Sequence, residues 1–179
     1  MKRLWLILPL ALFGLFIGLA AYQMTQPKDE FVRSTMIGKP LPAFDLPGET
    51  EDAPRLTSQM FADGTPRLLN VWATWCLPCR AEMPWFVDFQ TNFGGDGFRV
   101  LGVSLDEPGW SAVRPFLERQ PVNYQIALAD TTEHLTQFGL INILPTTWLI
   151  DRNGRIAAKH VGLVDRGELE SEIDRLLNE

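Results

Sequence analysis

The 179-residue chain has few of the residues that build metal sites and disulfide scaffolds, with only two cysteines and two histidines. Because Cys76 and Cys79 have no further thiols to pair with, a disulfide-rich scaffold is excluded. A structural zinc site needs four ligands, and the remaining candidates, His134 and His160, lack the close pairing of such sites. We therefore expect neither a metal nor a cofactor, and we interpret both histidines as surface or packing residues.

Basic residues are also scarce. The chain carries 16 Lys and Arg against 22 Asp and Glu, which gives a formal net charge of −6. Since binding to nucleic-acid phosphates requires a surplus of Lys and Arg, this balance argues against nucleic acid as a partner.

Charge is absent altogether from residues 4–22, directly after Lys2 and Arg3. An apolar run of this length is sufficient to cross a bilayer, and the two preceding cations predict a cytoplasmic N-terminus. A cleaved signal peptide is the alternative, but the run exceeds the roughly 7 to 15 apolar residues usual there. We expect residues 1–3 to be cytoplasmic, 4–22 a transmembrane anchor, 23–36 a tether and 37–179 an exported domain.

The pattern of apolar residues after the tether alternates between strands and helices. We expect strands at residues 68–72, 98–105, 124–128, 146–151 and 155–161, and helices at 76–93, 109–120, 132–138 and 165–177. Asn153-Gly154 predicts a hairpin between the last two strands, and residues 41–56 are expected to add a short edge hairpin. This order predicts an α/β fold with a central mixed sheet and helices on both faces.

The two cysteines lie where a buried strand passes into a helix. The Cys76 sulfur is expected at the helix N-terminus, where unpaired amide N–H groups and the helix dipole favour a thiolate. Pro78 fits the first turn, and Cys79 is expected one turn along on the buried side. A purely structural disulfide is a weaker alternative, because closing so short a loop removes little chain entropy. The spacing therefore predicts redox chemistry, with Cys76 attacking and Cys79 resolving.

Several segments carry a family resemblance. Residues 72–79, "WATWCLPC", resemble the active-site segment of thioredoxin-like proteins, and Leu144-Pro145-Thr146 resembles their cis-proline loop. Residues 37–47, 68–76 and 79–84 are similar to the CcmG/DsbE group of membrane-anchored thiol-disulfide proteins, within the TlpA/ResA-like family. The resemblance covers nearly all of residues 37–177 and implies a thioredoxin-like fold with a redox-active disulfide between Cys76 and Cys79.

The same resemblance implies an activity, a location and partners. It implies a periplasmic thiol:disulfide oxidoreductase, anchored in the bacterial inner membrane, that reduces the Cys-x-x-Cys-His site of apocytochrome c before haem attachment. A membrane thiol reductant of the DsbD or CcdA type would keep the protein reduced. Another client, such as a copper-site assembly protein of a respiratory oxidase, remains open. A copper chaperone of the Sco kind is disfavoured, because it has three residues between its cysteines and this chain has two.

Glu82 is the expected proton partner of the dithiol. It follows Cys79 by three residues, so both side chains are expected on one side of a helix. The resemblance implies an acid that exchanges a proton with the resolving cysteine, and Asn70 stands where ordinary thioredoxins have a buried Asp. A solvated acid that complements the helix dipole is the alternative for Glu82.

The substrate-facing surface is expected around Trp75, Leu144, Pro145 and Thr146. The resemblance implies a cis Leu144-Pro145 bond opposite Cys76, which leaves neighbouring backbone free to pair with an extended client segment. CcmG proteins have Gly-Ala-Pro-Glu where this chain has Ile143 to Thr146. The loop is therefore more apolar and resembles the wider TlpA/ResA group.

Overall fold

The computed structural model describes residues 12–18, 36–50, 52–129 and 143–179. The chain divides into two units, Met1–Arg33 and Ser34–Glu179. In the first unit, residues 12–18 are helical. Within the described ranges, no helix is both long and apolar enough to cross a membrane. Most of the expected anchor, the expected helix at residues 132–138 and His134 lie outside the described residues.

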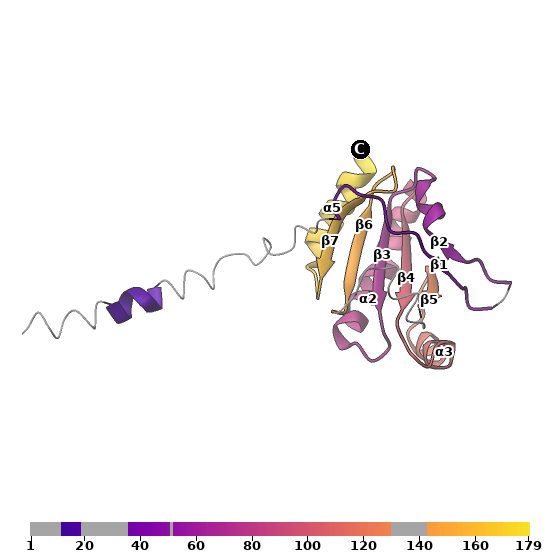
Figure 1. Cartoon of the computed structure of the whole chain (residues 1–179), viewed down its shortest axis with the longest axis horizontal. Coiled ribbons are helices and arrows are strands. Elements are labelled where there is room, and N and C mark those ends of the chain that lie inside the picture. Colours follow the sequence, from indigo (N-terminus) through magenta and orange to yellow (C-terminus); the bar gives the residue numbers. More distant parts are fainter. Residues whose placement is uncertain (1–11, 19–35, 51, 130–142) are drawn as a thin grey trace, which may run out of the picture. The chain divides into compact units, whose positions relative to one another are not determined.

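The second unit is built on a five-stranded mixed sheet. Its strands lie in the order β5-β4-β3-β6-β7 (Figure 1), and β3, β4 and β5 run parallel while β6 and β7 are each antiparallel to their neighbour. The strands are β3 Arg67–Trp72, β4 Arg99–Ser104, β5 Gln125–Leu128, β6 Thr146–Ile150 and β7 Ile156–Val161. The central strand β3 is buried along its whole length, as an apolar run covered on both faces requires. The predicted mixed α/β sheet is confirmed.

Helices cover one face of this sheet. They are α2 Leu77–Phe93, α3 Trp110–Arg119 and α5 Arg166–Asn178. Phe86 and Phe89 of α2 pack with Leu68 of β3 in a cluster that also holds Leu169 and Ile173 of α5. The α2 helix gives way to the 3-10 helix η3, Gly94–Asp96, close to the predicted stop.

Helix α3 packs near the β5 side of the same face. The ring of Phe116 lies 5.4 Å from the ring of Trp72, whose side chain points to the same face as Leu68 because strand residues alternate. The Trp72 side chain is almost fully buried and is part of the core.

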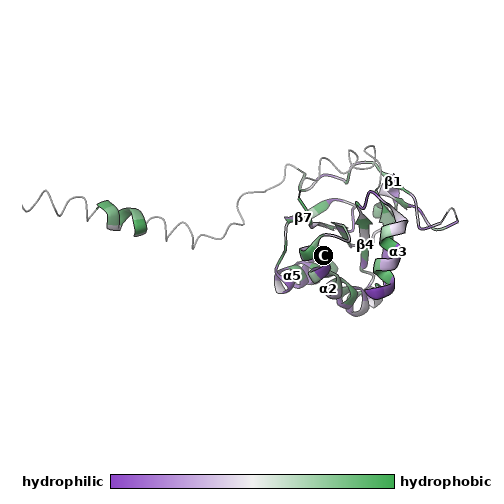
Figure 2. Cartoon of the chain, turned by 90° about the horizontal axis from the view of Figure 1, so that it is seen from below, coloured by the Kyte–Doolittle hydropathy of each residue, from purple (hydrophilic) through white to green (hydrophobic). Residues whose placement is uncertain are grey.

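The N-terminal segment of the unit covers the opposite face. Strands β1 Asp45–Leu46 and β2 Leu56–Thr57 pair antiparallel as a separate two-stranded sheet, and the 3-10 helix η2 Ser58–Ala62 follows. Leu46, Leu56 and Phe61 form one apolar cluster with Leu69 and Trp148. Figure 2 shows β1 on one side of the sheet and α2 and α5 on the other. The predicted hairpin is confirmed, but its position at the sheet edge is wrong: it is a separate sheet that covers one face of the five-stranded sheet. None of the described α-helices lies on that face.

The β6–β7 hairpin turns at Gly154, whose φ of 72° lies in the left-handed region that favours glycine. The Gly154 N–H donates to the Asp151 carbonyl, and the Asp151 side chain accepts from the N–H groups of Asn153 and Arg155. A Cβ on Gly154 would also meet the Phe61 carbonyl at 2.6 Å. The predicted hairpin is confirmed, with a turn specified by Asp151 as well as by Asn153-Gly154.

Candidate active site

Cys76 and Cys79 form a disulfide at the N-terminus of α2, with their Cα atoms 5.3 Å apart. Cys76 is the N-cap residue, and its Sγ accepts the backbone N–H of Cys79 at 3.3 Å. In the reduced protein the same donor and the dipole of α2 favour a Cys76 thiolate. Cys76 is 4% exposed and Cys79 is fully buried, so access to the pair is from the Cys76 side.

Large apolar side chains are exposed on both sides of Cys76 in the chain and in two further loops. Trp75 and Leu77, on either side of Cys76, are 71% and 72% exposed. Ile143 and Leu163, from two further loops, are also exposed. Contact of such side chains with water is unfavourable, and burying them against another molecule is favourable. A group of them beside a reactive pair therefore indicates a contact surface for another molecule.

The cis-proline loop lies next to the disulfide. Leu144 packs against the cluster that contains both cysteines, and the Leu144-Pro145 peptide bond is cis, as the family resemblance implies. Thr146 begins β6, and its hydroxyl donates to the Ile143 carbonyl at 2.7 Å. The structure therefore brings this loop to the dithiol, but Pro145 and Thr146 are buried, and the exposed side chain of the loop is Ile143.

Glu82 is a buried acid on the same helix as the dithiol. Its side chain is fully buried, like that of Cys79 one turn earlier. The Val164 N–H donates to Oε1 at 3.0 Å, whereas Oε2 has no hydrogen-bond partner among the described residues. Burial raises the pKa of Glu82 from its ordinary value of 4.5 to about 7, against the opposing effects of the Val164 N–H and His160. The structure excludes a solvated first-turn acid at this position.

Polar side chains on three neighbouring strands lead from Asn70 through Thr147 to His160, whose charge acts on Glu82. Asn70 on β3 donates to the Thr147 hydroxyl on β6 at 3.0 Å, and Thr147 pairs in register with His160 on β7. The His160 Nε2 lies 2.7 Å from Oε2 of Glu172 on α5. The hydrogen bond to Glu172 raises the pKa of His160, and the charges of Glu172, Glu168 and Glu82 add to this effect. His160 is thus more than a packing residue.

Sequence analysis missed several of these features. It did not identify the exposed Leu77 and Leu163, and it did not connect His160 with Glu82. The connection depends on strand register: Asn70, Thr147 and His160 are neighbours only after β3, β6 and β7 have paired. One sequence signal was available. Residues alternate between the two faces of a strand, so His160 lies on the same face as Ala158, which packs with residues of α2 and α5.

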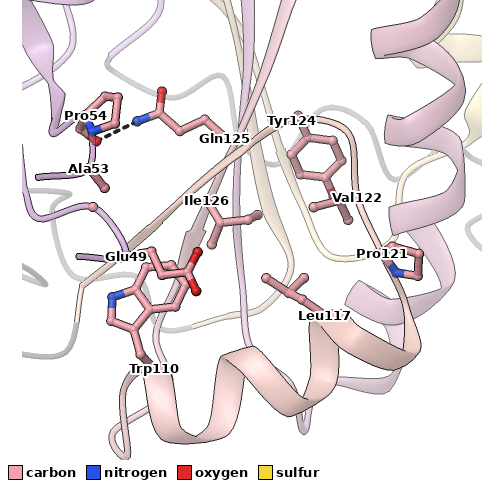
Figure 3. A pocket seen from close by; sticks show the side chains of 11 residues that line it. Glu49, Ala53, Pro54, Trp110, Leu117, Pro121, Val122, Tyr124, Gln125 and Ile126 are labelled. Atoms are coloured by element: carbon pink, nitrogen blue, oxygen red, sulfur yellow. Dashed lines mark hydrogen bonds between the residues drawn. The ribbon is translucent and has the colours of Figure 1, made fainter.

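One cavity among the described residues has neither cysteine in its lining. This cavity of about 500 Å³ lies between the β1–β2 connection, α3 and β5, with Trp110, Leu117 and Ile126 among its lining residues (Figure 3). Gln125 closes part of it by donating to the Pro54 carbonyl at 3.1 Å. In the part of the chain that the structure describes, no three His, Cys, Asp or Glu side chains are grouped to hold a metal ion.

Comparison with known proteins agrees with this site. Residues 37–159 match the AhpC/TSA family. The thiol:disulfide interchange protein DsbE of Pseudomonas aeruginosa is 36% identical over 184 aligned residues that cover 100% of this chain and 98% of that protein. DsbE of Escherichia coli K12 is 31% identical, covering 98% and 95% of the two chains.

A solved structure shows the same fold. The crystal structure of a thiol:disulfide interchange protein of the thioredoxin family from Chlorobium tepidum superimposes with a TM-score of 0.65 at 29% identity, covering 77% of this chain and 95% of that one. The sequence, the sheet topology and the Cys76–Cys79 pair thus agree. The chain belongs to the thioredoxin-like AhpC/TSA family and, within it, to the DsbE thiol:disulfide interchange proteins, and it is a thiol:disulfide oxidoreductase.

Proposed function

We propose that this oxidoreductase works as a reductase of exported disulfide proteins, and that its client is the Cys-x-x-Cys-His site of apocytochrome c before haem attachment. The observation that supports Cys76 as the attacking sulfur is the hydrogen bond from the Cys79 N–H to the Cys76 Sγ at the N-terminus of α2. A thiolate held there is a ready nucleophile towards another protein's disulfide.

The reaction has two exchanges. The Cys76 thiolate attacks one client sulfur, which breaks the client disulfide, forms a mixed disulfide and releases the other client sulfur as a thiolate that takes up a proton. The Cys79 thiol then loses its proton and attacks Cys76, which breaks the mixed disulfide and releases the second client thiolate. The client gains two electrons, and the protein is left with the Cys76–Cys79 disulfide, the state of the structure.

Glu82 is the proposed proton acceptor for Cys79. A base for a buried thiol must itself be able to change protonation near neutral pH, and burial raises the pKa of Glu82 to about 7. Glu82 lies one turn after Cys79, and the unpartnered Oε2 is free to receive a proton. Asn70 cannot titrate, so it cannot replace Glu82 in this role.

The apolar residues around the disulfide are the proposed docking surface. Trp75 and Leu77 on one side and Ile143 of the cis-proline loop on the other flank the path to Cys76. An extended client segment would bury part of these side chains while its backbone pairs beside Leu144 and Pro145. Trp75, Leu144, Pro145 and Thr146 retain the substrate-binding role expected of them, with Pro145 and Thr146 shaping the loop from within.

Location and partners belong to the same proposal. The uncharged segment 4–22 after Lys2 and Arg3 supports a single-pass anchor in the bacterial inner membrane with the domain in the periplasm. Because that compartment is oxidising, a client's thiols would become paired and need reduction. A membrane thiol reductant of the DsbD or CcdA type would then reduce the Cys76–Cys79 disulfide after each cycle.

A different client is a second candidate. Ile143, exposed in the cis-proline loop, makes the docking surface more apolar than the CcmG pattern with glycine there. This favours a client with an apolar segment beside its disulfide, and a copper-site assembly protein of a respiratory oxidase is the alternative client. The chemistry at Cys76 would be the same.

Trapping the mixed disulfide tests both the chemistry and the client. With Cys79→Ala the second exchange cannot occur, so we expect a covalent adduct between Cys76 and the client, detected on a non-reducing gel and identified by mass spectrometry. With Cys76→Ala no adduct is expected, because Cys79 is fully buried. Absence of an adduct from the Cys79→Ala protein, under conditions in which the wild type turns over, would remove Cys76 from its proposed role.

A further inference from the structure

A pocket of about 340 Å³ lies directly beside the dithiol segment, between the start of α2 and helix α3. Its lining includes two arginines and two aromatic residues, the exposed Trp75 and the buried Phe116. The lining residues are Thr74, Trp75, Arg80, Ala112, Phe116, Arg119 and Gln120. Trp75 is the residue before Cys76, so the pocket adjoins the path to the attacking sulfur.

The two arginines carry charge without a partner. Arg80 and Arg119 are exposed and form no ion pair with any described residue. By contrast, Arg114 on the same helix as Arg119 is paired with Glu49 at 3.0 Å. Both arginines line the same pocket, so it gathers positive charge in a chain of net charge −6.

Neighbouring contacts hold Arg80 in place. Its guanidinium carbon lies 5.7 Å from the ring centre of Phe116, within cation–π range. Its backbone carbonyl accepts the side-chain amide of Gln120 on the α3 side at 3.0 Å. The contact with Phe116 restricts the Arg80 guanidinium before any ligand arrives, which reduces the entropy lost on binding.

Asp106, whose carboxylate contacts the pocket residue Thr74, forms no ion pair with either arginine. Its Oδ2 accepts from the Thr74 N–H at 2.9 Å and the Ser104 hydroxyl at 2.7 Å, and its Oδ1 accepts from the Thr74 hydroxyl at 2.6 Å. Asp106 is 1% exposed, so its oxygens face inwards. Its contact with Thr74 fixes the pocket wall next to Trp75.

We propose that this pocket binds an acidic side chain of the client, Asp or Glu, within about two residues of the client's disulfide. The inference rests on the proposed function and names a feature of its substrate. Guanidinium groups bind carboxylates through paired N–H···O bonds, and the exposed face of Trp75 covers the aliphatic part of the side chain. The short reach follows because Trp75 adjoins Cys76 and an extended chain advances about 3.3 Å per residue.

Two disulfide peptides that differ in one residue test the proposal. Each contains one intramolecular disulfide, with Glu in one peptide and Gln in the other beside the cysteine that Cys76 attacks. With the reduced full-length chain in excess at low ionic strength, one turnover is followed, and its second-order rate constant is taken as kcat/KM. We expect this value to be about twofold to fivefold higher for the Glu peptide, the size of an exposed ion pair. The preference should shrink at ~0.5 M salt because the charges are screened.

Variants assign the preference to the pocket. The double substitution Arg80→Gln and Arg119→Gln should bring the ratio of the two kcat/KM values to about one, whereas Arg114→Gln on α3 should leave it unchanged. A general effect on the dithiol slows both peptides alike and leaves the ratio intact. Equal rates for the two peptides with wild type, or a preference that survives the double substitution, would overturn the proposal.

A binding measurement separates this inference from the proposed function. The oxidised full-length chain is titrated with linear versions of both peptides in which Ser replaces Cys, and the Trp75 indole N–H is followed by NMR. A shift of this signal by the Glu peptide alone, lost in the double variant, supports the pocket even if neither disulfide peptide is reduced. No shift with either peptide contradicts it, whatever the reductase assay shows.

Discussion

The burial of Glu82 changes its pKa and thereby its proposed role in the reaction. Its carboxyl group is enclosed by α2 and the loop before α5, where a single N–H group, that of Val164, contacts it. One hydrogen bond is too few to offset the loss of hydration of a carboxylate, so the protonated form is favoured. The same side chain thereby becomes a base that can titrate near neutral pH beside a buried thiol.

Glu82→Gln should change how stability depends on pH. The pKa of Glu82 is about 7 in the folded state and near 4.5 when exposed, so the folded state retains a proton that the unfolded state loses. The contribution of Glu82 to the free energy of unfolding should therefore be largest below pH 4.5 and fall by about 3 kcal/mol as pH rises through 7. Gln cannot ionise, so this contribution should be absent from the variant in urea titrations at several pH values.

A matched control is Glu118→Gln, which removes an exposed acid from α3. Its pH profile should run parallel to that of wild type. Parallel profiles for Glu82→Gln and wild type would show that Glu82 ionises as an ordinary surface acid. The alkylation rate of the reduced cysteines, measured over the same pH range, should lose a titration near 7 in Glu82→Gln only.

Helix α5 and strand β7 are joined by a polar contact as well as by apolar packing. The Glu172 carboxylate of α5 holds His160 of β7 at 2.7 Å, next to the buried Ile173. Protonated His160 lowers the pKa of Glu82. The contact between Glu172 on α5 and His160 on β7 therefore affects the protonation of Glu82 on α2.

Glu172→Gln should lower the pKa of His160, since its largest stabilising contact with the charged imidazole becomes neutral. NMR titration of the imidazole protons measures this shift. In wild type, the raised pKa contributes stability that is present below pH 6.5 and is lost as pH rises through the folded value. The variant should therefore be less stable than wild type mainly at acidic pH.

Asp174→Asn is the corresponding control, because Asp174 is an exposed acid of the same helix that forms no hydrogen bond or ion pair with His160. It should leave the imidazole titration unchanged. An unchanged titration in Glu172→Gln as well would show that the contact between α5 and β7 does not determine the charge of His160.

The protein as a whole combines a disulfide oxidoreductase domain with an N-terminal segment that we propose to be its anchor. In the proposed setting, loss of the protein leaves apocytochrome thiols oxidised in an oxidising compartment. Deletion of the gene should therefore lower covalently bound c-type haem, measured by haem staining of denaturing gels. An added small thiol reductant should restore it, because it replaces the two electrons that the protein supplies.

Normal c-type haem in the deletion strain would exclude apocytochrome c as the necessary client. Complementation with the Cys76→Ala chain supplies the control, since this variant keeps the domain but lacks the attacking sulfur. If it restores haem as well as wild type does, the effect of the deletion does not depend on thiol chemistry.

Much of the fold and part of the site could be predicted from the sequence, because these features depend on neighbours along the chain. The five strands of the sheet follow from apolar runs, and the Cys76 N-cap, Pro78 and buried Cys79 follow from the local geometry of a helix start. The hairpin at Gly154 and the Asp165 cap, which accepts the Glu168 N–H at 3.0 Å, are local in the same sense.

Only the tertiary structure decided which distant residues share an environment. The sequence by itself determined that a reactive thiol pair lies at a helix N-terminus, since that depends on a few adjacent residues. It could not show that His160 and Glu172 face the environment of Glu82, or that Arg80 and Arg119 line one pocket beside Trp75. Those relations arise from strand register and helix packing, which bring together residues that are tens of positions apart.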